Sequence, residues 1–311
     1  MVASPGSRSI HRMTLGDKRI SRRTLLGATA LLPLTACSTS ATTGSAPTTQ
    51  ARHDRLFELE RKFDARLGVY ALDTASGATI AHRADERFAF CSTFKGLAAA
   101  AMLHRNPMSH LDTVIRYTDE DLTKNAAITP QHVATGMTIR DLCDAAVRYS
   151  DGTAGNLLLR DIGGPAELTA YLHGLGDPVT RMDRIEPAIT EATPGDLRDT
   201  SSPRALSTDY QRIVLGDALP GGKRAFLRDL LERNATGAGA LRVRAGVPPG
   251  WQVADKTGTG DYGTLNDIAI VWPPERAPLV ISLMSSKATA AAEYDQALLA
   301  EAAAYVVKAL A

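Results

Sequence analysis

The strand-like segments of this sequence fall into two groups that a long helical region separates. Two short apolar runs, at 67–73 and 78–82, flank the turn signal Ser76-Gly77. Three further strand-like runs come much later, near 251–257, 265–272 and 278–285. Most of the chain between the two groups has helical spacing instead. Strands from both ends therefore have to join one antiparallel sheet, while the middle forms a layer of helices.

Helical periodicity and chain breakers complete the expected architecture. Residues 178–202 lack an apolar period and contain several Pro, Gly and acidic residues, so a long loop is expected there. Helices are expected at 51–66, 92–104, 138–147, 152–162, 203–215, 221–233 and 289–310. The predicted fold class is α+β, with a five-stranded antiparallel sheet, flanking helices and an all-helical lobe over about residues 92–233. A crevice between the two lobes is the expected place for a site.

The N-terminal residues 1–37 are expected to be an export signal rather than part of the fold. A basic segment precedes the apolar run Leu25–Ala36, which is too short to span a bilayer as a helix. The pair Arg22-Arg23 resembles a twin-arginine signal. The segment Leu34–Cys37 resembles a lipobox, in which the Cys is acylated and becomes the new N-terminus.

The segment after this signal is expected to be a flexible tether. Residues 38–50 consist mostly of Ser, Thr, Gly and Ala, which cannot bury enough apolar surface to order themselves. Residues 51–311 then remain as the folded domain. The protein is expected to be exported, either secreted or lipid-anchored through Cys37 to the outer face of the cell membrane.

The charge balance argues against nucleic acid as a partner. Lys plus Arg number 35 and Asp plus Glu number 34, a formal charge of +1, whereas nucleic-acid binders usually carry a clustered basic excess. The His residues show no H-E-x-x-H or similar ligand spacing, so neither a metal nor another cofactor is expected. Only the N-terminal lipid would bring the chain to a membrane, and a monomer is the default expectation.

Three separated fragments carry residues suited to nucleophilic catalysis. They are Ser92-Thr93-Phe94-Lys95, Ser150-Asp151-Gly152 and Lys256-Thr257-Gly258-Thr259-Gly260. A serine hydroxyl is a poor nucleophile unless a neighbouring base activates it. Ser92 and Lys95 stand three residues apart, so they share one face of a helix and Lys95 can reach the hydroxyl. Burial near a second cation such as Lys256 would lower the pKa of Lys95 and make it a usable base.

Together, in this order and at these separations, the three fragments resemble the motif set of class A β-lactamases and penicillin-binding proteins. The resemblance runs from about Leu67 to the C-terminus and includes Phe88–Cys91, Arg184–Pro187, Trp251 and Asp255. The chain is similar to a class A serine β-lactamase of the actinobacterial, twin-arginine-exported lipoprotein type. That family implies small β-lactam substrates, a Ser92 acyl-enzyme and resistance to β-lactam antibiotics.

The resemblance also implies a role for each site residue. The catalytic set is Ser92, Lys95, Ser150 and Glu186. In it, Ser150 relays a proton to the ring nitrogen and Glu186 aims the hydrolytic water. The N–H groups of Ser92 and Thr259 would form the oxyanion hole. The substrate-binding set is Lys256, Thr257, Gly258, Thr259, Arg242 and Gly152. The supporting set is Asn156, which braces Glu186, the loop clamp Arg184–Asp199, and the turn acceptor Asp151.

Three positions depart from the family pattern. Gly152 stands where most relatives have Asn, so a roomier site that admits bulkier drugs is expected. Thr190 replaces an Asn that helps to hold the hydrolytic water, and Asn125 replaces an aromatic wall. Cys143 matches a position that some relatives pair with a Cys where this chain has Ala99, so Cys91 and Cys143 are expected to be unpaired.

Two other functions use part of the same set. A D,D-carboxypeptidase or transpeptidase shares the Ser and the Lys but lacks the loop that carries Glu186. A penicillin-sensing lipoprotein would acylate and never turn over. Because hydrolysis of the ester needs a base that activates water, Glu186 on its long loop favours the β-lactamase.

Overall fold

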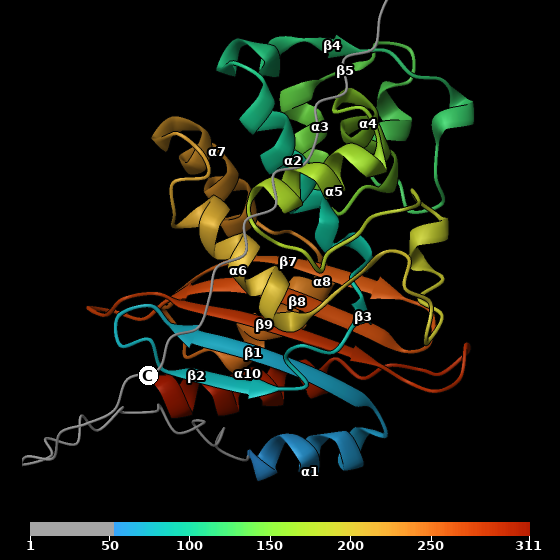
Figure 1. The fold of residues 1–311 in the computed structure, drawn as a ribbon. Helices are drawn as coiled ribbons and strands as arrows, with labels where there is room; N and C mark the ends of the chain where they lie inside the picture. Colours follow the sequence, from blue (N-terminus) through green and yellow to red (C-terminus); the bar gives the residue numbers. More distant parts are fainter. Residues whose placement is uncertain (1–52) are drawn as a thin grey trace, which may run out of the picture. The chain divides into compact units, whose positions relative to one another are not determined.

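Five strands form one antiparallel sheet in the computed structural model, which describes residues 53–311 (Figure 1). Their order is β2-β1-β9-β8-β7. The strands are β1 (Arg66–Asp73), β2 (Thr79–His82), β7 (Gln252–Gly260), β8 (Thr264–Trp272) and β9 (Leu279–Ser286). The register of β1 against β9 runs from Arg66 opposite Ser286 to Asp73 opposite Leu279. This pairing joins the two groups of strands, which confirms the predicted α+β class.

Two helices, α1 (Asp54–Phe63) and α10 (Ala297–Leu310), cover one face of the sheet (Figure 1). Leu56 and Leu59 of α1 are fully buried with Leu299 of α10 in one apolar cluster. Because residues three apart share a helix face, this spacing gives α1 a single apolar stripe.

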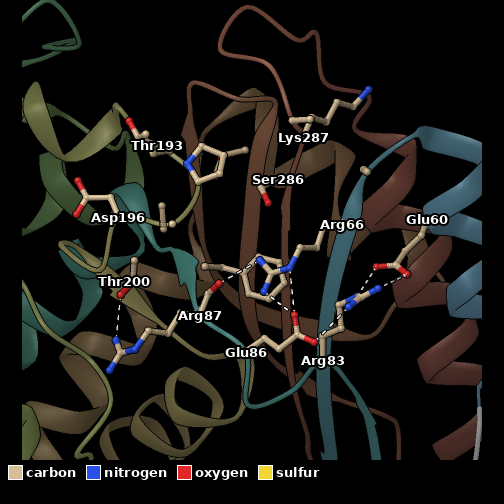
Figure 2. Close-up of a pocket in the computed structure, with 18 of the residues that line it drawn as sticks. Glu60, Arg66, Arg83, Glu86, Arg87, Thr193, Asp196, Thr200, Ser286 and Lys287 are labelled. Carbon is tan, nitrogen blue, oxygen red and sulfur yellow. Dashed lines mark hydrogen bonds and ion pairs between the residues drawn. The ribbon is translucent and has the colours of Figure 1, made fainter.

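An ion pair also fixes α1 to the sheet. Arg83, just after β2, donates from Nε to Glu60 Oε1 of α1 at 2.7 Å (Figure 2). Glu60 also accepts from the backbone N–H of Leu67 at 2.8 Å. The first helix is therefore held to both of the first two strands.

The other face of the sheet carries the helical lobe (Figure 1). Its helices are α2 (Phe94–Arg105), α3 (Ile139–Arg148), α4 (Gly152–Asp161), α5 (Pro165–Gly174), α6 (Pro203–Val214) and α7 (Gly221–Glu232). Helix α2 is buried on all sides from Phe94 to Leu103. Its Ala-rich middle lets α3, α4 and α7 pack closely around it. Helix α6 lies between the lobe and strands β1, β8 and β9.

Short elements complete the chain. They are β3 (Phe88–Ala89), β4 (Val114–Ile115), β5 (Met137–Thr138), β6 (Thr200–Ser201), α8 (Gly237–Leu241), α9 (Val243–Gly246), and the 3₁₀ helices η1 (Cys91–Thr93), η2 (Met108–Asp112), η3 (Asp119–Asp121), η4 (Thr129–His132) and η5 (Ala188–Thr190). Strands β3 and β6 pair with each other. This pairing ties the end of the 178–202 loop to the segment that leads into Ser92.

The structure differs from the expected elements in two ways. Helices α5, α8 and α9 were not predicted, and the last helix begins at Ala297 rather than at residue 289. The Ala-rich segment before it is held by tertiary contacts that override its helical propensity. The N–H of Tyr262 donates to the carbonyl of Ala290 at 2.9 Å, and the Gln296 side chain accepts from Arg242 at 2.6 Å.

The predictions for the N-terminus stay untested, because the signal at 1–37 and the tether at 38–50 lie outside the described residues. Within residues 53–311, no helix has both the length and the apolar character needed to cross a membrane.

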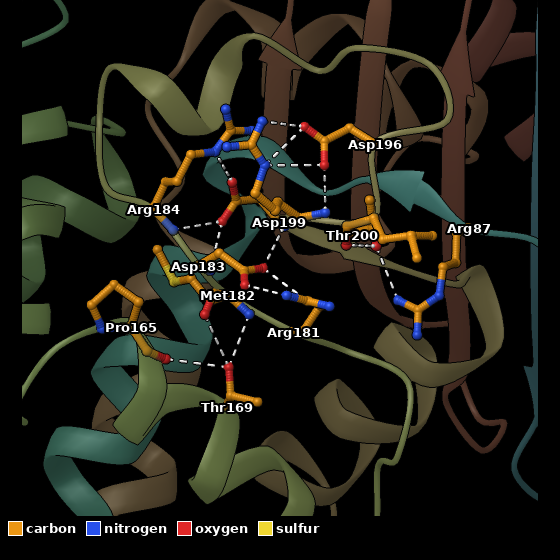
Figure 3. A network of polar contacts seen from close by, with 12 residues as sticks. Arg87, Pro165, Thr169, Arg181, Met182, Asp183, Arg184, Asp196, Asp199 and Thr200 are labelled. Atoms are coloured by element: carbon orange, nitrogen blue, oxygen red, sulfur yellow. Dashed lines mark hydrogen bonds and ion pairs between the residues drawn. The ribbon is translucent and has the colours of Figure 1, made fainter.

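The loop at 178–202 is clamped at its base (Figure 3). Asp199 accepts from Arg184 Nε at 2.5 Å through one carboxylate oxygen. Its other oxygen accepts from the backbone N–H groups of Asp183 and Arg184 at 2.8 and 2.9 Å. Asp199 is only 1% exposed, so water screens this charge pair weakly. The clamp brings the two ends of the loop together, and it joins the two residues, Arg184 and Asp199, to which the family resemblance gives this role.

Two buried carboxyl groups lie beside the start of this loop. Asp177 accepts from the backbone N–H groups of Val179 and Thr180 at 2.7 and 3.2 Å. Asp209 of α6 is fully buried near Asp177, and neither of its carboxylate oxygens has a hydrogen-bond partner among the described residues. Burial, and next the charge of Asp177, raises the pKa of Asp209 well above its ordinary value, against the opposing charge of Arg212. The raised pKa favours the neutral form of the Asp209 carboxyl.

We predict that Asp209→Asn stabilises the protein increasingly as the pH rises above about 4. A carboxyl whose pKa is raised on folding contributes stability below its unfolded pKa, and that stability is lost as the pH rises through the folded pKa. The Asn amide keeps a donor toward Asp177 without needing a proton. Urea unfolding at pH 4 to 8 should show a gain of at most about 1.4 kcal/mol per pH unit within that window. The exposed Asp217→Asn serves as the control; a pH-independent difference for Asp209→Asn would contradict the assignment.

Candidate active site

Ser92 lies in a tight turn at the start of α2. The preceding residue, Cys91, has a left-handed φ of 47°, and the 3₁₀ turn Cys91–Thr93 runs directly into the helix. This turn presents Ser92 at the helix N-terminus, where free N–H groups and the helix dipole favour developing negative charge. The hydroxyl lines a cleft, although the residue as a whole is only 9% exposed.

Three side chains converge at this hydroxyl. Lys95 Nζ donates to Ser92 Oγ at 2.9 Å and to Glu186 Oε1 at 2.9 Å. Ser92 Oγ in turn donates to Glu186 Oε1 at 3.2 Å. A third hydrogen of Lys95 Nζ goes to the backbone carbonyl of Ser150 at 2.8 Å. An ammonium group has three donors and no acceptor, so these contacts occupy all of them.

A second lysine contacts Ser150 from the side of the sheet. Lys256 of β7 is fully buried and donates from Nζ to Ser150 Oγ at 3.0 Å. Burial, and next the charge of Lys95, lowers the pKa of Lys256 to about 7. Ser150 has a left-handed φ of 58°, in the connection between α3 and α4. This conformation lets its carbonyl face Lys95 while its hydroxyl faces Lys256.

Glu186 is held through its backbone rather than through its carboxylate alone. Asn156 of α4 accepts from the Glu186 N–H at 3.0 Å and donates to the Glu186 carbonyl at 3.0 Å. Both oxygens of the Glu186 carboxylate lie in the interior, since the residue is 3% exposed. Oε1 receives Ser92 and Lys95, whereas Oε2 has no hydrogen-bond partner among the described residues. This second oxygen is free to accept a hydrogen bond from a molecule in the site.

The cleft above Ser92 has a volume of about 640 Å³. Strand β7 forms one wall with Thr257, Gly258 and Thr259. A Cβ atom at Gly258 would come within 2.6 Å of the carbonyl of Phe90, so only glycine lets β7 pass this close to the Ser92 turn. Two sequence fragments that are far apart in the chain are thereby brought into one cleft.

Arg242, expected to bind the substrate, lies behind this wall instead of lining the cleft. Its side chain is fully buried and donates to the carbonyls of Gly258 and Asn266, each at 2.7 Å. It also donates from Nη2 to the hydroxyl of Thr259 at 2.6 Å. Arg242 therefore positions the Thr259 hydroxyl. The positive charge of Arg242 acts on the cleft through this hydrogen bond.

The space beside Gly152 does not match the expected roomier site. A Cβ atom at Gly152 would lie 2.5 Å from Thr123 Oγ1, so the hydroxyl of Thr123 fills the volume where a side chain would begin. The N–H of Gly152 donates to the Asn125 carbonyl at 2.7 Å. The 123–125 segment therefore packs directly onto the start of α4. The hydroxyl of Thr190 donates to the Pro187 carbonyl at 2.7 Å, which leaves its lone pairs as acceptors.

Asp151 is fully buried and acts as an acceptor for backbone groups. It caps α4 through the N–H of Ala154 at 2.8 Å and accepts from the N–H groups of Ile128 and Thr129 at 2.8 and 3.0 Å. Cys91 and Cys143, the two cysteines within residues 53–311, are both free and buried.

Sequence reasoning missed several residues that line the cleft: Lys124, Tyr149, Thr236 and Tyr294. Thr236 caps α8, and its hydroxyl lies 3.4 Å from that of Thr257. Tyr149 directly precedes Ser150, and this adjacency is a signal that could have identified it. Nothing local marks Tyr294, which the segment before α10 brings to the cleft.

Comparisons with known proteins agree on one family. Residues 51–310 match the family model described as the Beta-lactamase enzyme family. A β-lactamase of Mycobacterium tuberculosis is 52% identical over 95% of this chain and 99% of its own length. One from Amycolatopsis lactamdurans is 55% identical over 85% of this chain and 87% of its own.

Solved structures give the same result. The class A β-lactamase from Clostridium kluyveri superposes with a TM-score of 0.81 at 45% identity, covering 82% of this chain and 97% of that one. The β-lactamase from Streptomyces albus G gives a TM-score of 0.80 at 46% identity, covering 83% and 98%.

Proposed function

The chain belongs to the Beta-lactamase enzyme family as a class A serine β-lactamase, and from that premise we propose which residues carry each step of its reaction. It hydrolyses β-lactam antibiotics and so confers resistance to them. The observation that carries the proposal is the convergence of Ser92 Oγ, Lys95 Nζ and Glu186 Oε1 within 3.2 Å of one another.

Acylation begins with attack of Ser92 Oγ on the carbonyl carbon of the β-lactam ring. The hydroxyl proton moves to Glu186 Oε1, the acceptor to which it already points at 3.2 Å. Lys95 is the less suitable base in the free enzyme, because its three hydrogens are already donated. Its charge stabilises the developing negative charge on Oγ instead. The new bond joins Oγ to the carbonyl carbon, and the bond from that carbon to the ring nitrogen breaks.

The departing nitrogen needs a proton, and Ser150 is the group suited to supply it. Its hydroxyl lines the cleft and contacts Lys256 Nζ at 3.0 Å. With a pKa of about 7, Lys256 can replace the proton that Ser150 gives away. Glu186 then loses its proton to water in the cleft and Lys256 regains one from water, which readies both groups for deacylation.

Deacylation uses the carboxylate of Glu186 a second time. Oε2 has no protein partner, so it can accept a hydrogen bond from a water molecule beside the ester. The water oxygen bonds to the carbonyl carbon while its proton passes to Glu186, and the bond from that carbon to Ser92 Oγ breaks. The proton then returns to Ser92, which restores the starting state.

Recognition of the substrate carboxylate falls to the β7 wall. Thr257 and Thr259 line the cleft, and Lys256 lies directly behind them. Arg242 acts as a positioning residue through the Thr259 hydroxyl. The D,D-peptidase and the penicillin-sensing lipoprotein are not favoured, because neither explains a buried Glu186 that shares hydrogen bonds with the nucleophile.

For the N-terminus we propose export through a twin-arginine signal and acylation of Cys37. The sequence pattern Arg22-Arg23, an apolar run and Leu34–Cys37 supports this proposal. The β-lactam would then be destroyed outside the membrane, before it reaches the cell.

We predict that Glu186→Gln traps the acyl-enzyme. Gln keeps the shape of the side chain but cannot accept a proton from Ser92 or from water, and general-base groups typically contribute about 10²–10⁴-fold. Acylation slows but still proceeds, because Lys95 no longer faces a carboxylate and can take the Ser92 proton, whereas the hydrolytic water is left without a base. Intact-mass spectrometry after mixing with benzylpenicillin should show the protein heavier by one whole penicillin, and this adduct should persist for hours. Steady-state turnover of nitrocefin should fall by at least about 100-fold.

The control for this experiment is Glu191→Gln, an exposed carboxylate on the same loop. It should turn over at close to the wild-type rate, because exposed ion pairs contribute little. If Glu186→Gln hydrolyses nitrocefin as fast as the control and shows no adduct, the role given to Glu186 is wrong.

We predict that Cys37→Ser releases the exported protein from the membrane. Without the thiol no lipid can be attached, so the activity should move from the membrane fraction to the culture medium. The buried Cys143→Ser should leave the distribution unchanged. Replacing Arg22 and Arg23 together by Lys should keep the protein inside the cell. If wild type and Cys37→Ser divide in the same proportion between the membrane fraction and the culture medium, the proposed lipid anchor is wrong.

A further inference from the structure

A groove of about 800 Å³ lies between helix α4 and the 178–202 loop. It is lined by residues 120–124, by residues 185–187 of the loop, by the second half of α4, and by residues 163–165, which lead into α5. Its volume is in the range of small-molecule sites.

The groove adjoins the catalytic cleft. Lys124 lines both hollows. Glu186 lines the groove, and its Oε1 lies 3.2 Å from the Oγ of Ser92, which lines the cleft. A substrate that is bonded to Ser92 is therefore placed next to the groove.

The structure of the β-lactam ring determines which part of the substrate faces the groove. In the four-membered ring, the nitrogen and the carbon that bears the acylamino side chain are bonded to opposite sides of the carbonyl carbon. Lys95 Nζ contacts the Ser150 carbonyl at 2.8 Å and the Glu186 carboxylate at 2.9 Å. With the nitrogen turned toward Ser150, the side chain points away from Ser150 and toward the loop that carries Glu186.

Most polar side chains of the groove already have partners. Arg160 pairs with Asp121 at 3.1 Å. Asn156 uses both ends of its amide on the backbone of the loop, in two hydrogen bonds of 3.0 Å. Glu120 and Lys124 are exposed, so water solvates their charges. A polar ligand would gain little here, because it would have to replace bonds that already exist.

The rest of the lining is apolar, and part of it is open to solvent. Ile185 is 46% exposed, and Pro187, two residues further on, is exposed as well. Leu122 is half-buried in the 120–124 segment. An apolar group that covers these side chains removes their surface from water, which is favourable.

Hydrogen bonds between α5 and the loop hold this side of the groove in place (Figure 3). Thr169 of α5 accepts from the backbone N–H of Met182 at 2.9 Å, and its hydroxyl lies 3.3 Å from the carbonyl of Pro165. The 163–165 turn is therefore joined to the loop three residues before Ile185. A ligand loses little binding free energy to the ordering of a site that is already formed.

We propose, as an extension of the function given above, that this groove binds the acyl side chain of β-lactams in which that chain is long and apolar. The ring occupies the catalytic cleft, and the chain passes Lys124 and packs against Ile185 and Leu122. One buried methylene group is worth about fourfold in binding, so two suffice for a preference of more than about tenfold.

The test compares two penicillins that differ only in the length of the side chain, one acetyl and one octanoyl. The full-length protein should hydrolyse the octanoyl compound with a kcat/KM at least about tenfold higher. Ile185→Asp and Leu122→Ser should each lower this ratio at least about threefold. The control is Leu197→Asp, which replaces an exposed leucine of the same loop outside both hollows and should leave the ratio unchanged.

The ratio is taken within one preparation, so partial unfolding of a variant lowers both rates and cancels. Equal kcat/KM for the two penicillins in the wild type would overturn the proposal. A wild-type ratio in both Ile185→Asp and Leu122→Ser, or an equal loss in Leu197→Asp, would also overturn it. Hydrolysis of neither penicillin would instead refute the proposed function itself.

Discussion

A fully buried ammonium group holds the catalytic centre of this protein together. Lys95 of α2 reaches the nucleophile Ser92, the carbonyl of Ser150 between α3 and α4, and the Glu186 carboxylate on the long loop. A charge removed from water is tolerated only when its partners are all in place, so each of these three elements depends on the other two. The same contacts that make the buried charge tolerable also aim Ser92 Oγ at its base. Stability and chemistry are therefore coupled at one side chain.

The 178–202 loop carries Glu186 into this arrangement and is held there by contacts within the loop and from α4. The Arg184–Asp199 pair closes its base, Asp177 accepts from the backbone N–H groups at its start, and Asn156 fixes the backbone of Glu186. The first contact lies within the loop, whereas Asn156 reaches it from α4. The middle of the loop borders the cleft through Thr190.

Local sequence patterns predicted those features of the fold and the site that depend on neighbouring residues in the chain. The two groups of strands required a sheet that joins both chain ends, and the spacing of Ser92 and Lys95 required a shared helix face. Glu186, 94 residues from Ser92, was identified only through the family resemblance. The burial of Arg242 and the filling of the space at Gly152 by Thr123 were not foreseen, because both depend on side chains packed from distant segments. The last helix was predicted too long because tertiary contacts at Ala290 and Gln296 override its propensity.

The central claim is that Lys95 is charged and Glu186 ionised in the free enzyme, so that Glu186 takes the proton of Ser92. Neutron diffraction from crystals of the free enzyme, exchanged into heavy water at neutral pH, measures this directly. The account predicts three deuterons on Lys95 Nζ, directed at Ser92, Ser150 and Glu186, and none on the Glu186 carboxylate. Two deuterons on Lys95 together with one on Glu186 would contradict it and would make Lys95 the base.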